Sequence, residues 1–120
     1  MKRRVLAAVP DMFFAAKIRG TAEALGVEIE FARTVEAAIE KGSANTPSLV
    51  VADLHALTPD PFALAERFKS DERLRAVPLL GFCSHVETEL QERARQAGFD
   101  RVLPRSAFAS RLPQILGGEM

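Results

Sequence analysis

The stretch Leu49-Val50-Val51-Ala52-Asp53 gives the strongest indication of the fold. Four consecutive apolar residues are typical of a strand whose two faces are both buried in a parallel sheet. Asp53 follows them directly, at the end of the strand where such sheets bind ligands and carry out chemistry. Val5-Leu6-Ala7-Ala8-Val9 is a second apolar run of this kind, and it predicts another buried strand.

Between these two strands the sequence predicts a helix, an edge strand and a second helix. Asp11 is a helix-capping residue, and the helix that it begins is expected to stop at Gly26. Apolar and acidic residues then alternate over residues 27–31, as in a strand with one face in water. Thr34 begins a short helix, and residues 42–47 are expected to form a loop.

The same alternation continues after Asp53. Asp60-Pro61 has the pattern of a helix cap followed by a proline at the first helical position, and residues 77–82 form the next expected strand. Ser84 and Glu87 have the spacing of a capping box, which predicts a helix that ends at residue 98.

A fifth strand is expected at residues 99–103, and Ser106 begins a last helix that Pro113 should kink or divide. Strand–helix pairs joined by short loops favour right-handed crossovers, and therefore a doubly wound parallel sheet with helices on both faces. The predicted fold class is α/β, and residues 1–120 are expected to form a single domain.

The composition excludes several classes of protein. The 120 residues include 16 Lys and Arg against 16 Asp and Glu, and the positive charges are spread along the chain. This balance argues against nucleic acid or an anionic membrane as a partner. No apolar run approaches the roughly 18 residues of a membrane-spanning helix, and no signal peptide is evident. One cysteine cannot form a disulfide framework, and we expect a cytoplasmic protein.

The spacing of the residues at the expected strand ends resembles that of the receiver domains of bacterial response regulators. Asp53 stands where receivers have the aspartate that is phosphorylated; Asp60 stands where many have another aspartate, although Pro61 replaces the glycine that usually follows. Cys83 and Arg105 occupy the positions of the switch Thr or Ser and of a lysine. The resemblance implies a flavodoxin-like three-layer sandwich with strand order 2-1-3-4-5 and a role in two-component signal transduction.

The sequence departs from the receiver pattern at four parts of the phosphorylation switch. Val9-Pro10 takes the place of two adjacent acids that hold Mg²⁺, and Asp11 is displaced from that place by one residue. The thiol of Cys83 is a poorer hydrogen-bond donor than a hydroxyl, and Arg105 replaces a compact ammonium by a planar guanidinium. Val102 stands where receivers usually have an aromatic residue.

Two interpretations of Asp53 remain open. Arg105 could neutralise it permanently, since an arginine and a carboxylate in a sheltered place can form a two-pronged pair. Alternatively, Asp53 is a working phosphoacceptor with Mg²⁺ held by Asp11 and a backbone carbonyl, because phosphoryl transfer depends on the electrostatic stabilisation that such an ion supplies. A helix cap is the commoner role for an aspartate such as Asp11. No other cofactor is expected.

Cys83, His55 and His85 also allow two interpretations each. Proximity to Arg105 and to a helix start would lower the pKa of the Cys83 thiol and suit a redox sensor, whereas a small buried side chain is the simpler explanation. The two histidines are expected at the same sheet edge as Cys83 and Asp53, where they could bind Zn²⁺ or Ni²⁺. Solvated loop histidines are commoner, and the spacing fits no established motif.

The leading hypothesis is a stand-alone, atypical receiver that acts through protein contacts and is not an enzyme. The resemblance implies a histidine kinase or a downstream signalling protein as partner, and a partner or homodimer surface on the fourth helix, fifth strand and fifth helix. The residues expected on that surface are Glu87, Leu90, Arg101 and Val102. The alternative is a functional receiver phosphorylated on Asp53. An enzyme or cofactor-binding function is disfavoured because no glycine-rich phosphate loop follows the first strand.

Overall fold

A computed structural model describes residues 3–84 and 87–118 of the chain. The strands are β1 (Arg4–Ala8), β2 (Glu28–Phe31), β3 (Leu49–Asp53), β4 (Leu79–Cys83) and β5 (Arg101–Pro104). The helices are α1 (Met12–Leu25), α2 (Val35–Ala44), α3 (Pro61–Ser70), α4 (Thr88–Ala97), α5 (Arg105–Ser110) and α6 (Leu112–Gly117). Neighbouring strands are parallel, and their order is β2-β1-β3-β4-β5. The predicted fold class and strand order are confirmed.

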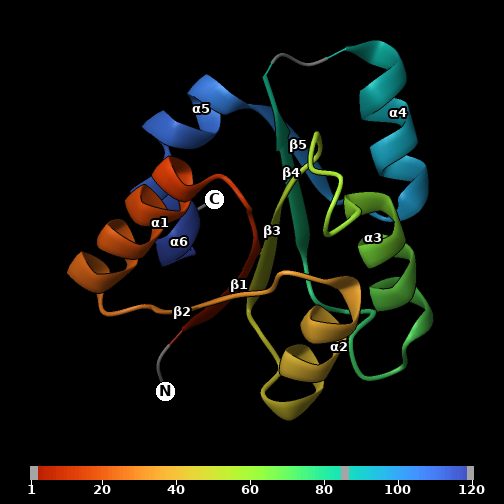
Figure 1. Cartoon of the computed structure of the whole chain (residues 1–120), viewed down its shortest axis with the longest axis horizontal. Coiled ribbons are helices and arrows are strands. Elements are labelled where there is room, and N and C mark those ends of the chain that lie inside the picture. Colours follow the sequence, from red (N-terminus) through yellow and green to blue (C-terminus); the bar gives the residue numbers. More distant parts are fainter. Residues whose placement is uncertain (1–2, 85–86, 119–120) are drawn as a thin grey trace.

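The helices cover both faces of the sheet (Figure 1). α2, α3 and α4 lie on one side, and α1, α5 and α6 lie on the other. Successive residues of a strand point to opposite faces, so Leu6 and Val50 belong to one hydrophobic cluster while Val5 and Val51 belong to the other. All residues of β3 are buried, as its apolar run predicts. No helix within residues 3–84 or 87–118 has the length and apolar character needed to cross a membrane.

Several predicted helix ends are confirmed. Asp11 caps α1 by accepting a hydrogen bond of 3.0 Å from the backbone N–H three residues further on. Gly26 ends the same helix with a left-handed backbone (φ 69°), which glycine adopts without strain. Asp60 caps α3, with Pro61 in its first turn. Pro113 stands in the first turn of α6, so the last helical segment is divided as expected.

Several predicted boundaries are wrong, and the strands expected at residues 77–82 and 99–103 begin at Leu79 and Arg101. The loop expected from residue 42 begins later, because α2 continues to Ala44. Gly42 is buried in this helix, and a Cβ there would lie 3.2 Å from the ring of Phe68, so the missing side chain lets α2 pack closely on α3. The capping box also fails, since α4 begins at Thr88 and Glu87 has an extended backbone (φ −106°, ψ 144°) instead of a helical one.

Candidate functional site

The candidate site lies at the carboxyl edge of the sheet, where β3 and β4 end side by side. Asp53 is the last residue of β3, and Cys83 is the last residue of β4. Arg105 follows β5 directly as the first residue of α5. Asp53 is 6% exposed, and within residues 3–84 and 87–118 it is the one charged residue that is buried. A buried charge is stable only beside an opposite charge or hydrogen-bond donors, so Asp53 requires such groups around it.

Asp53 and Arg105 form an ion pair. Arg105 Nη2 lies 3.7 Å from Asp53 Oδ2, and the backbone N–H of His55 donates a hydrogen bond of 2.9 Å to Asp53 Oδ1. Each carboxylate oxygen thus faces a positive group or a donor, which offsets the cost of burying the charge. At 3.7 Å the contact is too long for the hydrogen-bonded, two-pronged arrangement that one of the two interpretations of Asp53 allowed.

Phenylalanine rings support the guanidinium of Arg105. Its central carbon lies 5.6 Å from the ring centre of Phe14 and 5.8 Å from that of Phe82, within the range of cation–π attraction. Phe82 in turn stacks on Phe108, with ring centres 4.5 Å apart and planes 13° apart. Arg105 Nε is buried and has no hydrogen-bond partner in the part of the chain that the structure describes. The rings and Asp53 therefore position this group.

Cys83 is fully buried at the end of β4. Burial raises the pKa of its thiol, and the negative charges of Glu87 and Asp53 raise it further. Of the two interpretations of Cys83, the small buried side chain agrees with this environment; a lowered pKa does not, because burial and the two carboxylates act in the opposite direction. A buried thiol with a raised pKa stays protonated at neutral pH and is a weak nucleophile.

The other polar residues singled out in the sequence are only partly brought to this site. The carboxylate of Asp11 caps α1, which confirms the commoner role for such an aspartate. Ser84 Oγ lies 3.5 Å from Nε2 of His55. His85 lies outside the described residues. Among the residues that are described, no group of three or more His, Cys, Asp or Glu is placed to hold a metal ion.

The four residues predicted for a partner surface lie on or beside α4 and β5. Glu87 and Arg101 are exposed, whereas Leu90 and Val102 are half-buried and pack against the core. β5 stands at one end of the strand order, next to β4. This surface is therefore mainly polar, because its apolar side chains also serve the core.

Comparison with known proteins identifies the fold through structure alone. No protein-family model and no curated protein matches the sequence. A chemotaxis response regulator of Vibrio cholerae matches the structure with a TM-score of 0.85 at 16% identity, and the match covers 100% of both chains. The chain has the receiver fold of response regulators.

Two further solved structures show the same likeness. The receiver domain of a signal transduction histidine kinase from Syntrophus aciditrophicus has a TM-score of 0.76 and 22% identity, covering 97% of this chain and 91% of its own. A phosphorylated cyanobacterial phytochrome response regulator has a TM-score of 0.79 and 18% identity, covering 99% of this chain and 91% of its own. The fold that the spacing of Asp53, Cys83 and Arg105 implied is confirmed.

Proposed function

We propose that this chain is a cytoplasmic receiver-type signalling domain that acts through protein contacts without conventional Mg²⁺-dependent phosphorylation. The ion pair of Asp53 with Arg105 carries the proposal, since it gives the buried carboxylate a positive neighbour from the protein itself. A guanidinium remains charged at every physiological pH. Arg105 stands where receivers have a lysine, and in this chain the guanidinium is proposed to balance the carboxylate without the metal ion that receivers add.

The end of β1 supports the same conclusion. Val9-Pro10 stands where receivers have the acidic pair that holds Mg²⁺. A hard divalent cation needs several oxygen ligands, and at Asp53 it would meet one carboxylate that already faces a guanidinium. Phosphoryl transfer relies on neutralising charge on the phosphoryl group, and this chain has lost the residues that would bring Mg²⁺ to that task.

The test is to incubate the protein with Mg²⁺ and a small phosphodonor, and separately with Mg²⁺ and beryllofluoride. We expect no increase in mass and no shift of the amide NMR signals at millimolar Mg²⁺. Addition of one phosphoryl group, absent from the Asp53→Asn variant, would overturn the proposal. It would support the alternative, in which Asp53 is a working phosphoacceptor and Asp11 helps to bind the metal.

A matched variant makes a negative result informative. Pro10 is exposed two residues after the end of β1, so Pro10→Asp restores one acid of the receiver pattern without placing a charge in the core. We expect this variant, and not the natural chain, to show Mg²⁺-dependent amide shifts around residue 53. Equal Mg²⁺ binding by both proteins would contradict the role assigned to Val9-Pro10.

We further propose the α4–β5–α5 face as the contact surface for a partner protein or a second copy of the chain. The exposed charges of Glu87 and Arg101 support this assignment, because exposed charges on a polar face influence the choice of partner. Sedimentation over a concentration series of the natural chain and of Arg101→Glu tests the second copy. Concentration-dependent association that Arg101→Glu weakens would identify a homodimer, and a constant monomer mass would point to a different partner.

A further inference from the structure

A second hollow lies at the carboxyl edge of the sheet, over β1 and β2. Its volume is about 600 Å³, which is within the range of pockets that bind small molecules. In the strand order β2-β1-β3-β4-β5, the order reverses between β1 and β3. Such a reversal point is where open α/β sheets form their ligand crevices. The pocket borders this reversal point through Val9-Pro10 after β1 and Thr58-Pro59 after β3, and it extends over the end of β2.

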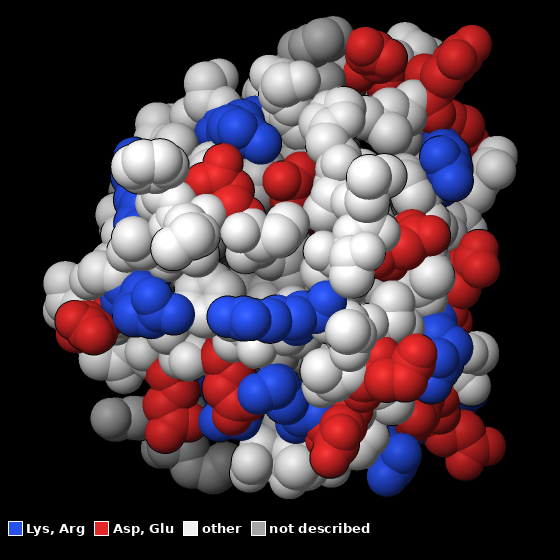
Figure 2. All heavy atoms as spheres, in the orientation of Figure 1, with Lys and Arg blue, Asp and Glu red and all other residues white. Residues whose placement is uncertain are grey.

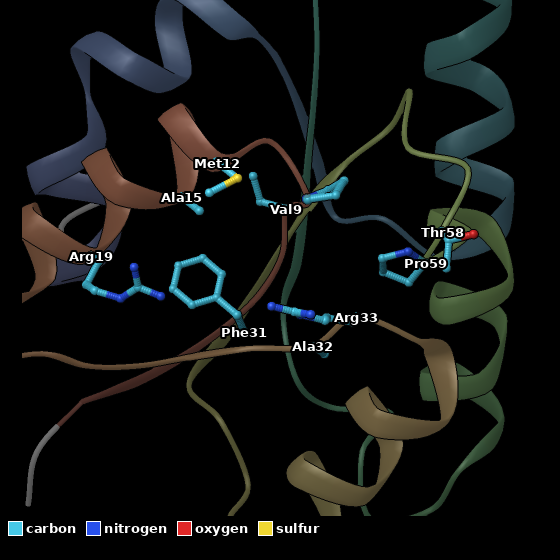
Figure 3. A pocket seen from close by; sticks show the side chains of 10 residues that line it. Val9, Met12, Ala15, Arg19, Phe31, Ala32, Arg33, Thr58 and Pro59 are labelled. Carbon is cyan, nitrogen blue, oxygen red and sulfur yellow. The ribbon is translucent and has the colours of Figure 1, made fainter.

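The pocket has an apolar wall and a basic wall (Figure 3). The apolar wall is formed from the end of β1, the start of α1 and the loop before α3, by Val9, Pro10, Met12 and Pro59. The basic wall consists of Arg19 from α1 and Arg33 from the segment after β2. Of the lining residues within the described ranges, none is acidic. Pockets with an apolar lining and a few convergent polar groups are typical of ligand sites.

The two arginines are not neutralised as Arg105 is. The guanidinium carbon of Arg19 lies 4.8 Å from the ring centre of Phe31, so a cation–π contact orients this group. Figure 3 shows the side chain of Arg33 pointing toward the same ring. In the part of the chain that is described, neither forms an ion pair, whereas Arg4 and Arg105 each contact a carboxylate. Among the described residues, no acid therefore balances their charges at the pocket.

We propose that this pocket binds a small organic anion, in which a carboxylate or phosphate group is attached to an apolar body. Guanidinium groups bind both head groups through paired N–H donors, and the apolar wall covers the rest of the molecule. Figure 2 shows a row of basic side chains across the middle of this face, with acidic side chains both above and below it, so the basic row is the place for the head group. Val9-Pro10 lines the wall at the place where receivers carry two negative charges. The inference does not depend on whether Asp53 is phosphorylated.

Titration of the whole chain, followed by amide NMR at low ionic strength, tests the pocket. The probes are adenosine monophosphate, 4-hydroxyphenylacetate and inorganic phosphate. We expect saturable shifts centred on residues 9–15, 31–33 and 58–59 with at least one organic probe, and roughly tenfold weaker binding of inorganic phosphate, which has no apolar body. Saturation by the nucleotide alone identifies a phosphate ester, and saturation by 4-hydroxyphenylacetate alone identifies a carboxylate. No saturation by either organic probe at about 10 mM, or equally tight binding of inorganic phosphate, would overturn the proposal.

Four variants separate a specific site from general attraction to positive charge. Arg19→Gln and Arg33→Gln should each weaken binding of the organic probe about tenfold or more. Arg75→Gln removes the same charge from an exposed position that does not line the pocket and should leave binding unchanged. Ala15→Phe fills the pocket without altering charge and should abolish binding. Equal weakening by Arg33→Gln and Arg75→Gln, or full binding by Ala15→Phe, would refute the assignment.

Discussion

The two sides of the carboxyl edge of the sheet use arginine differently. On the β3–β5 side, Arg105 lies against aromatic rings and faces the buried carboxylate of Asp53 at 3.7 Å. On the β1–β2 side, Arg19 and Arg33 line a pocket and form no ion pair in the described part of the chain. An arginine that neutralises a buried carboxylate supports the fold, whereas one without such a partner is free to bind a ligand.

The difference originates in the residues that follow each strand. β3 ends in Asp53 and β5 is followed by Arg105, so opposite charges meet where these strands end. β1 is followed by Val9-Pro10, and β2 by Ala32-Arg33, so an apolar surface meets a positive charge. The carboxyl edge of the sheet thus carries an ion pair on the β3–β5 side and a basic pocket on the β1–β2 side.

The largest expected effect comes from removing the aromatic support on the β3–β5 side. Phe108 is fully buried and stacks on Phe82, so Phe108→Ala should lower the free energy of unfolding by about 3–5 kcal/mol. Urea unfolding followed by circular dichroism measures the loss. Phe13→Ala removes the same ring from a position that is 91% exposed, and it should change stability by less than about 0.5 kcal/mol. Similar losses in both variants would contradict a closely packed support for the ion pair.

The ion pair itself should contribute less. Arg105→Ala leaves the buried carboxylate of Asp53 without its cation, which destabilises the folded state. Because the Arg105 side chain is 39% exposed, water screens part of the interaction, and we expect a loss of about 1 kcal/mol. Arg105→Lys keeps the charge and should recover part of that loss. Thermal unfolding provides the measurement, and an unchanged Tm in Arg105→Ala would remove the contrast between the two sides.

The β3–β5 side was predictable because its residues stand at strand ends. The apolar run before Asp53 marks where β3 stops, and the expected strands before Cys83 and Arg105 mark the ends of β4 and β5. In a parallel sheet the carboxyl ends of all strands lie at the same edge. Three residues far apart in the sequence could therefore be expected near one another, and the structure places them there.

Packing between distant segments could not be predicted in this way. Arg19 and Arg33 line one pocket because α1 and the end of β2 both border it, and no local spacing connects these two positions. Phe108 is fully buried against Phe82, and its position four residues before Leu112 is the kind of sequence signal that indicates an inward-facing residue. The start of α4 was misplaced because capping-box spacing is a local preference, and the backbone at Glu87 is extended in the folded chain.

The thiol of Cys83 gives a second test of the β3–β5 side, because the nearby carboxylates change its pKa. Burial and the carboxylates of Glu87 and Asp53 raise its pKa above the ordinary value of 9.0. The folded state then holds the proton more tightly than the unfolded chain, so this contribution to stability is complete below pH 9.0 and is lost as the pH rises through the folded pKa. Urea unfolding at about pH 8 and about pH 10 should show a smaller alkaline loss in Cys83→Ala than in the natural chain. The same loss in both proteins would mean that the thiol is not perturbed.

The smallest effects on stability are expected on the β1–β2 side, and they decide whether the contrast holds. Arg33→Ala removes an exposed side chain without an ion pair in the described part of the chain, so the free energy of unfolding should change by less than about 0.5 kcal/mol. Arg19→Ala also loses the contact with Phe31, and such exposed cation–π contacts contribute about 0.5–1 kcal/mol. Thermal unfolding at low and high salt measures both changes. If Arg33→Ala cost as much stability as Arg105→Ala, Arg33 would be a structural residue, and its presence in the pocket would no longer indicate a charge kept for a ligand.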